Sequence, residues 1–132
     1  MRGYERPLSL LLAAWVLAAT AAPASDPVPV IVGGDADLDA CGSVGEVYGL
    51  DPAGDGFLSV RAGPGTGYKE LDRLHNADRV ILCADHGKWL GVVYGEPGQD
   101  CGVGTPIPKR KPYDGPCHSG WINGNWVQLV AG

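Results

Sequence analysis

The chain has 132 residues, with 21 glycines, 11 prolines, four cysteines and a formal net charge of −5. Phosphate binding needs a positive surface, so the acidic balance argues against a nucleic-acid-binding protein. Turn-forming residues are frequent and no long stretch has helical periodicity, which predicts short strands joined by turns.

Residues 1–24 have the pattern of an export signal peptide. Arg2 and Arg6 precede an apolar run over residues 8–19, and Ala22-Pro-Ala24 is a small-x-small cleavage site. The run is too short to span a bilayer comfortably, and a retained signal-anchor helix is the alternative. Cleavage after Ala24 leaves 108 residues, with eight basic and fourteen acidic side chains. We therefore expect an exported protein, periplasmic or extracellular, without a transmembrane segment once the signal is removed.

Residues 25–43 are acidic and contain proline and glycine, which predicts a flexible linker ahead of a domain over residues 44–132. Three aspartates and a glutamate here copy the ligand spacing of a calcium loop. The glycine required at the sixth position is replaced by Ala40, and no flanking helix is apparent, so we expect no metal site. The four acidic residues are Asp35, Asp37, Asp39 and Glu46.

Alternating apolar residues predict strands at 44–50, 57–62, 68–74, 79–83 and 89–94. Ile81 and Cys83 share the strand face that points away from the core. The residues expected at core parity are Leu58, Val60, Leu71, Leu74, Val80, Leu82, Val92 and Tyr94.

The stretch Leu58-Ser-Val-Arg-Ala-Gly-Pro-Gly-Thr-Gly-Tyr68 joins one of these strands to a sharp turn. It resembles the signature of bacterial SH3 (SH3b) domains, as do Gly87-Lys-Trp89 and Gly120-Trp-Ile122 farther along. The resemblance covers residues 47–129 apart from one insert. It implies an all-β fold, a small SH3-like barrel of five to seven short antiparallel strands.

Residues 95–119 form a long insert that departs from the family pattern. Long loops without secondary structure are usually functional or covalently fixed. An even number of cysteines in a small exported domain indicates two disulfides, for which three pairings are possible. Cys101 and Cys117 bracket the insert, and Cys83 lies on the outer strand face. These positions favour Cys101–Cys117 and Cys41–Cys83, which would give a disulfide-stapled loop insert.

The histidines His75, His86 and His118 form no convincing catalytic or metal site. Cys83-x-x-His86 and Cys117-His118 have zinc-ligand residue types, but thiols in an exported protein are better used as disulfides. A Cys-His nucleophile would need a free thiol. We therefore expect no enzyme activity and no cofactor.

Aromatic side chains near strand ends are the better candidates for function. Such rings stack on sugar rings or on peptide backbone, with neighbouring amides as polar contacts. The alternative is that Trp89 and Trp121 plug the ends of the barrel. The candidate ligand-binding residues are Tyr48, Tyr68, Trp89, Trp121, Asn123 and Trp126, with Asn125 as a further polar contact.

The resemblance implies an exported, non-catalytic module that binds cell-wall peptidoglycan or its peptides. The alternative is a protein-binding module, such as an inhibitor or subunit of a secreted protein, that uses the insert as its contact surface. Lys109-Arg-Lys111, within the insert, is opposite in sign to the rest of the molecule. A short charge run of this kind is more often a solvated loop tip.

Overall fold

The computed structural model describes residues 3, 7, 9–18, 23–54 and 56–132, and its folded part is an all-β, antiparallel structure. A seven-stranded sheet has the order β4-β3-β8-β6-β5-β2-β9, and a small second sheet pairs β1 with β7. The strands are β1 (Ile31–Val32), β2 (Ser43–Val47), β3 (Leu58–Arg61), β4 (Glu70–Leu74), β5 (Arg79–His86), β6 (Trp89–Tyr94), β7 (Lys111–Pro112), β8 (His118–Asn123) and β9 (Val127–Ala131).

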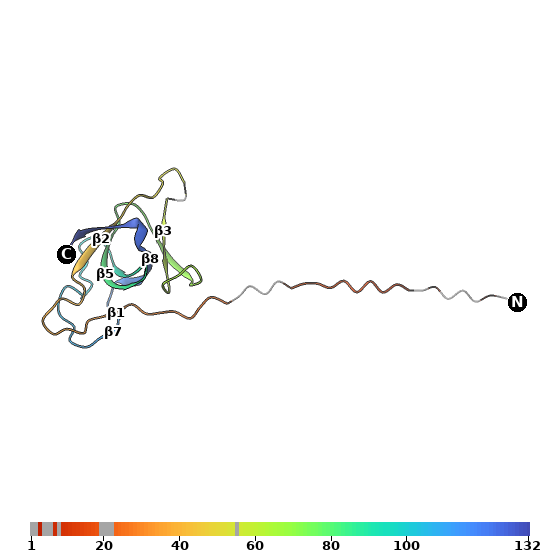
Figure 1. The fold of residues 1–132 in the computed structure, drawn as a ribbon, viewed down its shortest axis with the longest axis horizontal. Coiled ribbons are helices and arrows are strands. Elements are labelled where there is room, and N and C mark those ends of the chain that lie inside the picture. The colour runs from red at the N-terminus through yellow and green to blue at the C-terminus, as the bar shows by residue number, and fades with distance from the viewer. Residues whose placement is uncertain (1–2, 4–6, 8, 19–22, 55) are drawn as a thin grey trace.

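The large sheet curves around a common centre (Figure 1). The last strand, β9, returns to pair with the first strand of this sheet, β2. A single turn of 3₁₀ helix, Gly124–Trp126, separates β8 from β9. The edge strands β4 and β9 do not pair with each other, so the sheet is open in its hydrogen bonding.

The concave face of the sheet encloses an inner core. Strand β3 illustrates how the core forms. Its side chains alternate between buried and half-buried along Leu58–Arg61, so every second side chain faces the core. Val60, Val92 and Ile122 have no measurable exposure. Leu82 is partly buried and packs against this core. The core residues are Val47, Leu58, Val60, Leu74, Val80, Val92, Tyr94 and Ile122.

The prediction that Leu71 belongs to this core is wrong, since its side chain is 52% exposed. Leu71 and Leu74 both lie in β4 and are three residues apart. In a strand this separation puts them on opposite faces. Leu74 faces the inner core at 6% exposure, so Leu71 faces outward.

A second core covers the opposite face of the sheet, and residues 25–43 help to build it rather than forming a loose linker. Val30 and Val32 are each 2% exposed in this core. Strand β1 pairs with β7 of the insert, and the Cys41 N–H donates to the Val103 carbonyl. The amino-terminal segment and the insert therefore form one layer, which we call the outer layer. Its buried residues are Val30, Val32, Cys41, Val93, Cys101, Val103 and Trp121.

Both expected disulfides are confirmed. Cys41 is bonded to Cys83, with 4.8 Å between the Cα atoms, and thereby joins the outer layer to β5. Cys101 is bonded to Cys117, with 5.4 Å between the Cα atoms, and closes the insert. The placement of Ile81 and Cys83 against the outer core agrees with the predicted strand face. Two disulfides indicate an oxidising, extracytoplasmic environment.

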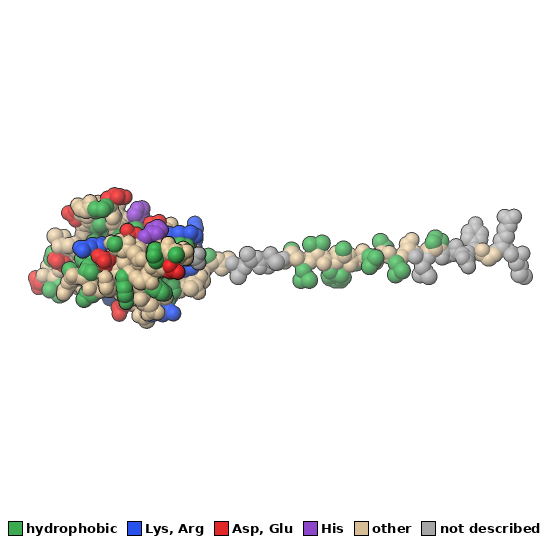
Figure 2. Space-filling model, turned by 90° about the horizontal axis from the view of Figure 1, so that it is seen from above, with side chains coloured by type: hydrophobic (Ala, Val, Ile, Leu, Met, Phe, Trp, Pro, Cys, Tyr) green, Lys and Arg blue, Asp and Glu red, His purple; other side chains and the backbone are tan. Residues whose placement is uncertain are grey.

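The apolar stretch at residues 9–18 is exposed and stands away from the folded part (Figure 2). Leu10, Leu12 and Leu17 are each at least 89% exposed. This exposure is consistent with an export signal. Part of the predicted signal, residues 1–2, 4–6, 8 and 19–22, lies outside the described residues. No helix in the described ranges is long and apolar enough to cross a membrane.

Candidate ligand-binding surface

Tyr48 and Trp126 form an exposed aromatic pair at one end of the sheet. The Tyr48 N–H donates to the Trp126 carbonyl at 3.0 Å, which extends the pairing of Val47 with Val127 in β2 and β9. The two side chains are 44% and 41% exposed. Both are sequence-predicted candidates, and the structure pairs their backbones and leaves both residues partly exposed to solvent.

Local backbone geometry holds this pair in place. Gly49 has a φ of 78°, a left-handed conformation that favours glycine, and a Cβ at this position would lie 3.5 Å from the Trp126 ring. The Asn123 side chain caps the 3₁₀ turn by accepting a hydrogen bond from the Asn125 N–H at 3.0 Å. The Gly124 N–H donates to the Lys88 carbonyl at 2.7 Å. Asn123 thus fixes the turn that presents Trp126.

The other two candidate tryptophans lie on the outer face. Trp121 is 5% exposed, and its Nε1–H donates to the Val28 carbonyl at 2.8 Å. Trp89 is half-buried against the outer core, opposite Asn123 across the β6–β8 pair. The structure therefore places Trp121 in the interior, where its ring is not available for stacking. No single groove in the described part of the chain unites all six candidates.

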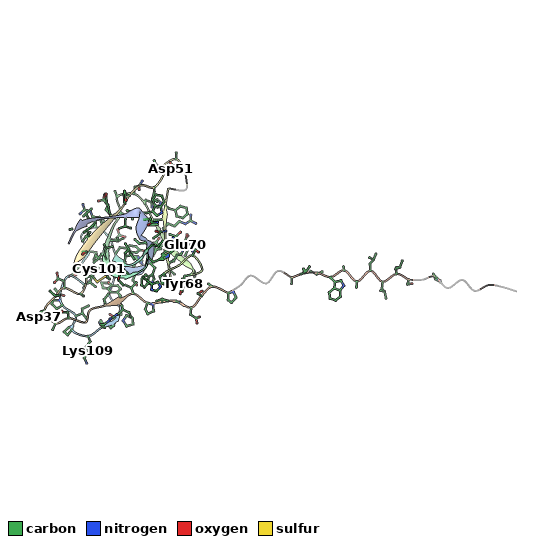
Figure 3. The ribbon with its side chains drawn as sticks, viewed as in Figure 1. Asp37, Asp51, Tyr68, Glu70, Cys101 and Lys109 are labelled. Atoms are coloured by element: carbon green, nitrogen blue, oxygen red, sulfur yellow. A yellow bond between two sulfur atoms is a disulfide. The ribbon has the colours of Figure 1, made fainter. Side chains whose placement is uncertain are left out.

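Tyr68 packs on the Gly-Pro-Gly turn that the sequence singled out. An added Cβ at Gly63 would lie inside the Tyr68 ring, so only glycine permits this contact. The Arg61 guanidinium donates to the Tyr68 carbonyl at 3.0 Å, linking the end of β3 to the end of the turn. The residue is thus occupied in shaping the turn, and Figure 3 shows it on the side of the amino-terminal segment.

A hydrogen-bonded cluster of titratable residues joins β4 to β6. The Arg73 N–H and the Tyr94 hydroxyl both donate to Asp72, at 2.8 Å and 2.9 Å, and hold the pKa of its carboxyl below the ordinary value. Burial, reinforced by this hydrogen bond, raises the pKa of Tyr94. The His118 ring centroid lies 5.4 Å from that of Tyr94.

Glu70 belongs to the same edge strand. A hydrogen bond from Ser59 and a second from Arg73 lower the pKa of the Glu70 carboxyl. These carboxylates are therefore ionised acceptors at neutral pH. They are engaged in strand-to-strand contacts of β3, β4 and β6.

A cavity of about 590 Å³ lies between the turn that precedes β5 and the start of the insert. The turn contributes Ala77 and Asp78, and the insert contributes residues 95–99. Sequence reasoning missed this cavity. Its walls come from segments far apart in the chain, and neither segment contains a recognisable binding motif.

The two disulfides exclude a zinc site with cysteine ligands and a Cys-His nucleophile. All four cysteines of the chain are paired, so no thiol is free to bind zinc or act as a nucleophile. The Asp35 carboxylate accepts hydrogen bonds from the Asp37 and Leu38 N–H groups and shapes its own loop. Within the described ranges, no three His, Cys, Asp or Glu side chains gather as a metal site would require.

The fold and the surface define an all-β, antiparallel, disulfide-linked domain with an exposed aromatic pair at one end. No family model, curated protein or solved structure matches this chain.

Proposed function

We propose that this protein is an exported, non-catalytic binding module with an SH3-like barrel of the bacterial type, and that it recognises cell-wall peptidoglycan or its peptides in the periplasm or outside the cell. The paired Tyr48 and Trp126 side chains carry the proposal. Exposed aromatic side chains on two residues whose backbones are hydrogen-bonded are suited to stacking on a sugar ring or a peptide plane.

The strand arrangement supports the proposal of an SH3-like barrel. The Gly-Pro-Gly turn follows β3, a 3₁₀ turn precedes the last strand, and that strand returns to β2. Seven short antiparallel strands surround one inner core. These features fit the barrel implied by the sequence signature, although fold alone does not define a ligand.

Sedimentation with insoluble, purified peptidoglycan tests the proposal. We expect the wild-type protein to pellet at low and moderate salt, because stacking depends little on ionic strength. Replacing a central aromatic anchor, Trp126→Ala, should weaken binding by about 2 kcal/mol, which is roughly thirty-fold.

Leu71→Ala provides the matched control. Leu71 is 52% exposed, like Trp126 at 41%, but lies in β4 at the other edge of the sheet. We expect it to bind as wild type. Thermal melting of both variants should stay near wild type, which separates lost contact from lost fold. A wild-type protein that remains in the supernatant at both salt concentrations contradicts the cell-wall proposal.

The rigidity of the insert favours a second candidate, a protein-binding module such as an inhibitor or subunit of a secreted protein. The Tyr113 hydroxyl donates to the Cys101 carbonyl at 2.8 Å and accepts from the Cys117 N–H at 3.1 Å. Lys109, the first residue of the basic segment 109–111, lies exposed at the outer edge of this fixed loop in an acidic molecule (Figure 3). Lys109→Glu would then weaken binding to an acidic secreted partner and leave peptidoglycan sedimentation unchanged.

A further inference from the structure

The cavity beside β5 has an apolar floor and walls from two different segments. Leu74, Val80 and Tyr94 are buried at its base, at 6%, 1% and 8% exposure. Its volume of about 590 Å³ is within the range of small-ligand sites, about 300–1,000 Å³. Cys101 also lines the cavity.

Both walls are held by hydrogen bonds within the protein. The Ala77 N–H donates to the Val47 carbonyl and the Val47 N–H donates to the Asp78 carbonyl, each at 2.9 Å. On the other wall, the Glu96 N–H donates to the Gln99 side chain at 3.0 Å, and the Gln99 N–H donates to the Glu96 carbonyl at 2.9 Å. The site is therefore preformed, and a ligand would not have to order it.

Ala77 is the one non-glycine residue with a positive φ, 75°, in the described part of the chain. Left-handed backbone is unfavourable for alanine and persists only where the surroundings impose it. Here the two hydrogen bonds to Val47 impose it and set the shape of the wall.

The charges around the opening are unequal. Asp78 lies on one wall and Glu96 on the other. Arg79 also lines the cavity, but its guanidinium faces Glu46, with 3.4 Å between Nε and Oε2, so its charge is partly compensated. The Glu96 carboxylate has no ion-pair partner among the described residues. An apolar floor below an uncompensated carboxylate complements an aliphatic chain that ends in an ammonium group.

The cavity is next to the exposed aromatic pair. The Val47 backbone is hydrogen-bonded to Ala77 and Asp78, which form one wall of the cavity, and Tyr48 follows Val47 in the chain. The Tyr48 N–H in turn donates a hydrogen bond to the Trp126 carbonyl. A short peptide stacked on the aromatic pair would need little length to reach the cavity with a side chain.

We propose that this cavity binds the alkyl-ammonium side chain of a diamino acid in a cell-wall stem peptide. The inference rests on the proposed function and names the chemical group recognised there. The apolar floor contacts the methylene chain, and Glu96 faces the ammonium group. A lysine side chain of a partner protein has the same chemistry, and the experiment distinguishes the two sources.

The test is isothermal titration of the full, disulfide-bonded protein with a synthetic stem peptide that carries lysine. The same peptide with its lysine amine acetylated is the second probe. We expect acetylation to weaken binding by about two- to five-fold, as expected for one partly exposed charge pair. Equal affinity of the two peptides overturns the proposal, as does the absence of any binding.

Glu96→Gln should lose the preference for the free amine, because the carboxylate is removed while the shape of the side chain is kept. Asp37→Asn is the control, since it removes an exposed carboxylate on a loop of the outer layer, away from the cavity. It should keep the full preference. A Glu96→Gln variant that still prefers the free amine overturns the assignment of Glu96.

Two further arms separate this inference from the proposed function. If the wild-type protein and Glu96→Gln sediment equally with peptidoglycan while Trp126→Ala does not, the cell-wall function stands and the cavity assignment fails. If an unrelated lysine peptide binds as tightly as the stem peptide, and peptidoglycan does not sediment the protein, the cavity recognises protein lysine and the stem-peptide assignment fails.

Discussion

Val30→Ala tests whether the segment after the export signal is structural. The Val30 side chain is 2% exposed in the outer core, and its replacement by alanine removes the two buried Cγ carbons. At about 0.8 kcal/mol for each group, plus the cost of the cavity left behind, the unfolding free energy should fall by about 2 kcal/mol. For a domain of this size the melting temperature should drop by about 10 °C.

Urea unfolding with a matched control makes this measurement decisive. Leu38 lies in the same segment, residues 25–43, but is 65% exposed, so Leu38→Ala should change stability by less than about 0.5 kcal/mol. Disulfides must remain intact in every sample. If Val30→Ala is no more destabilising than Leu38→Ala, the outer layer is not part of the cooperative fold and the segment behaves as a linker.

Three further predictions concern stability. Replacing Cys101 and Cys117 by alanine should lower the unfolding free energy by about 3 kcal/mol in the chain-entropy estimate, and non-reducing urea melts that show no change would contradict it. Tyr94→Phe should cost about 1 kcal/mol at neutral pH by removing the hydrogen bond to Asp72. The pKa of Tyr94 is raised in the folded protein, so its contribution is present below about pH 10 and is lost as pH rises further. The gap between wild type and Tyr94→Phe should therefore narrow in melts above pH 10, and a constant gap would refute the link. Ala77→Gly should stabilise the protein by about 0.5 kcal/mol, because removing the Cβ relieves the steric cost of the positive φ by more than the extra backbone entropy that glycine loses on folding, and a lower melting temperature would contradict this.

The strands of the large sheet and most of the inner core could be predicted from the sequence. Strand alternation is a local signal, and Val80 and Val92 fall on the buried face that their parity indicates. The same signal put Cys83 on the opposite face and supported its pairing with Cys41. The prediction for Leu71 is wrong because an odd separation from Leu74 puts the two side chains on opposite faces of the strand.

The outer layer could not be predicted because its contacts are non-local. Ile31 pairs with Pro112, and strands β2 to β6 of the large sheet lie between these two residues in sequence. The acidic residues around Ile31 have the composition of a linker. Parity correctly indicates that Trp121 and Ile122 face opposite sides. It does not indicate whether the outer side meets water or another layer, so the burial of Trp121 was not deducible.

This layer also explains why the candidate surface is confined to one end of the sheet. The amino-terminal segment and the insert cover the outer face, where they bury Trp121 and half-bury Trp89. The inner face is filled by its own core. Large aromatic rings can then meet a ligand only where neither layer reaches, and Tyr48 and Trp126 lie there, beside the turn that forms one wall of the cavity. An insert that departs from the family pattern thus limits the aromatic side chains exposed at this sheet to its end.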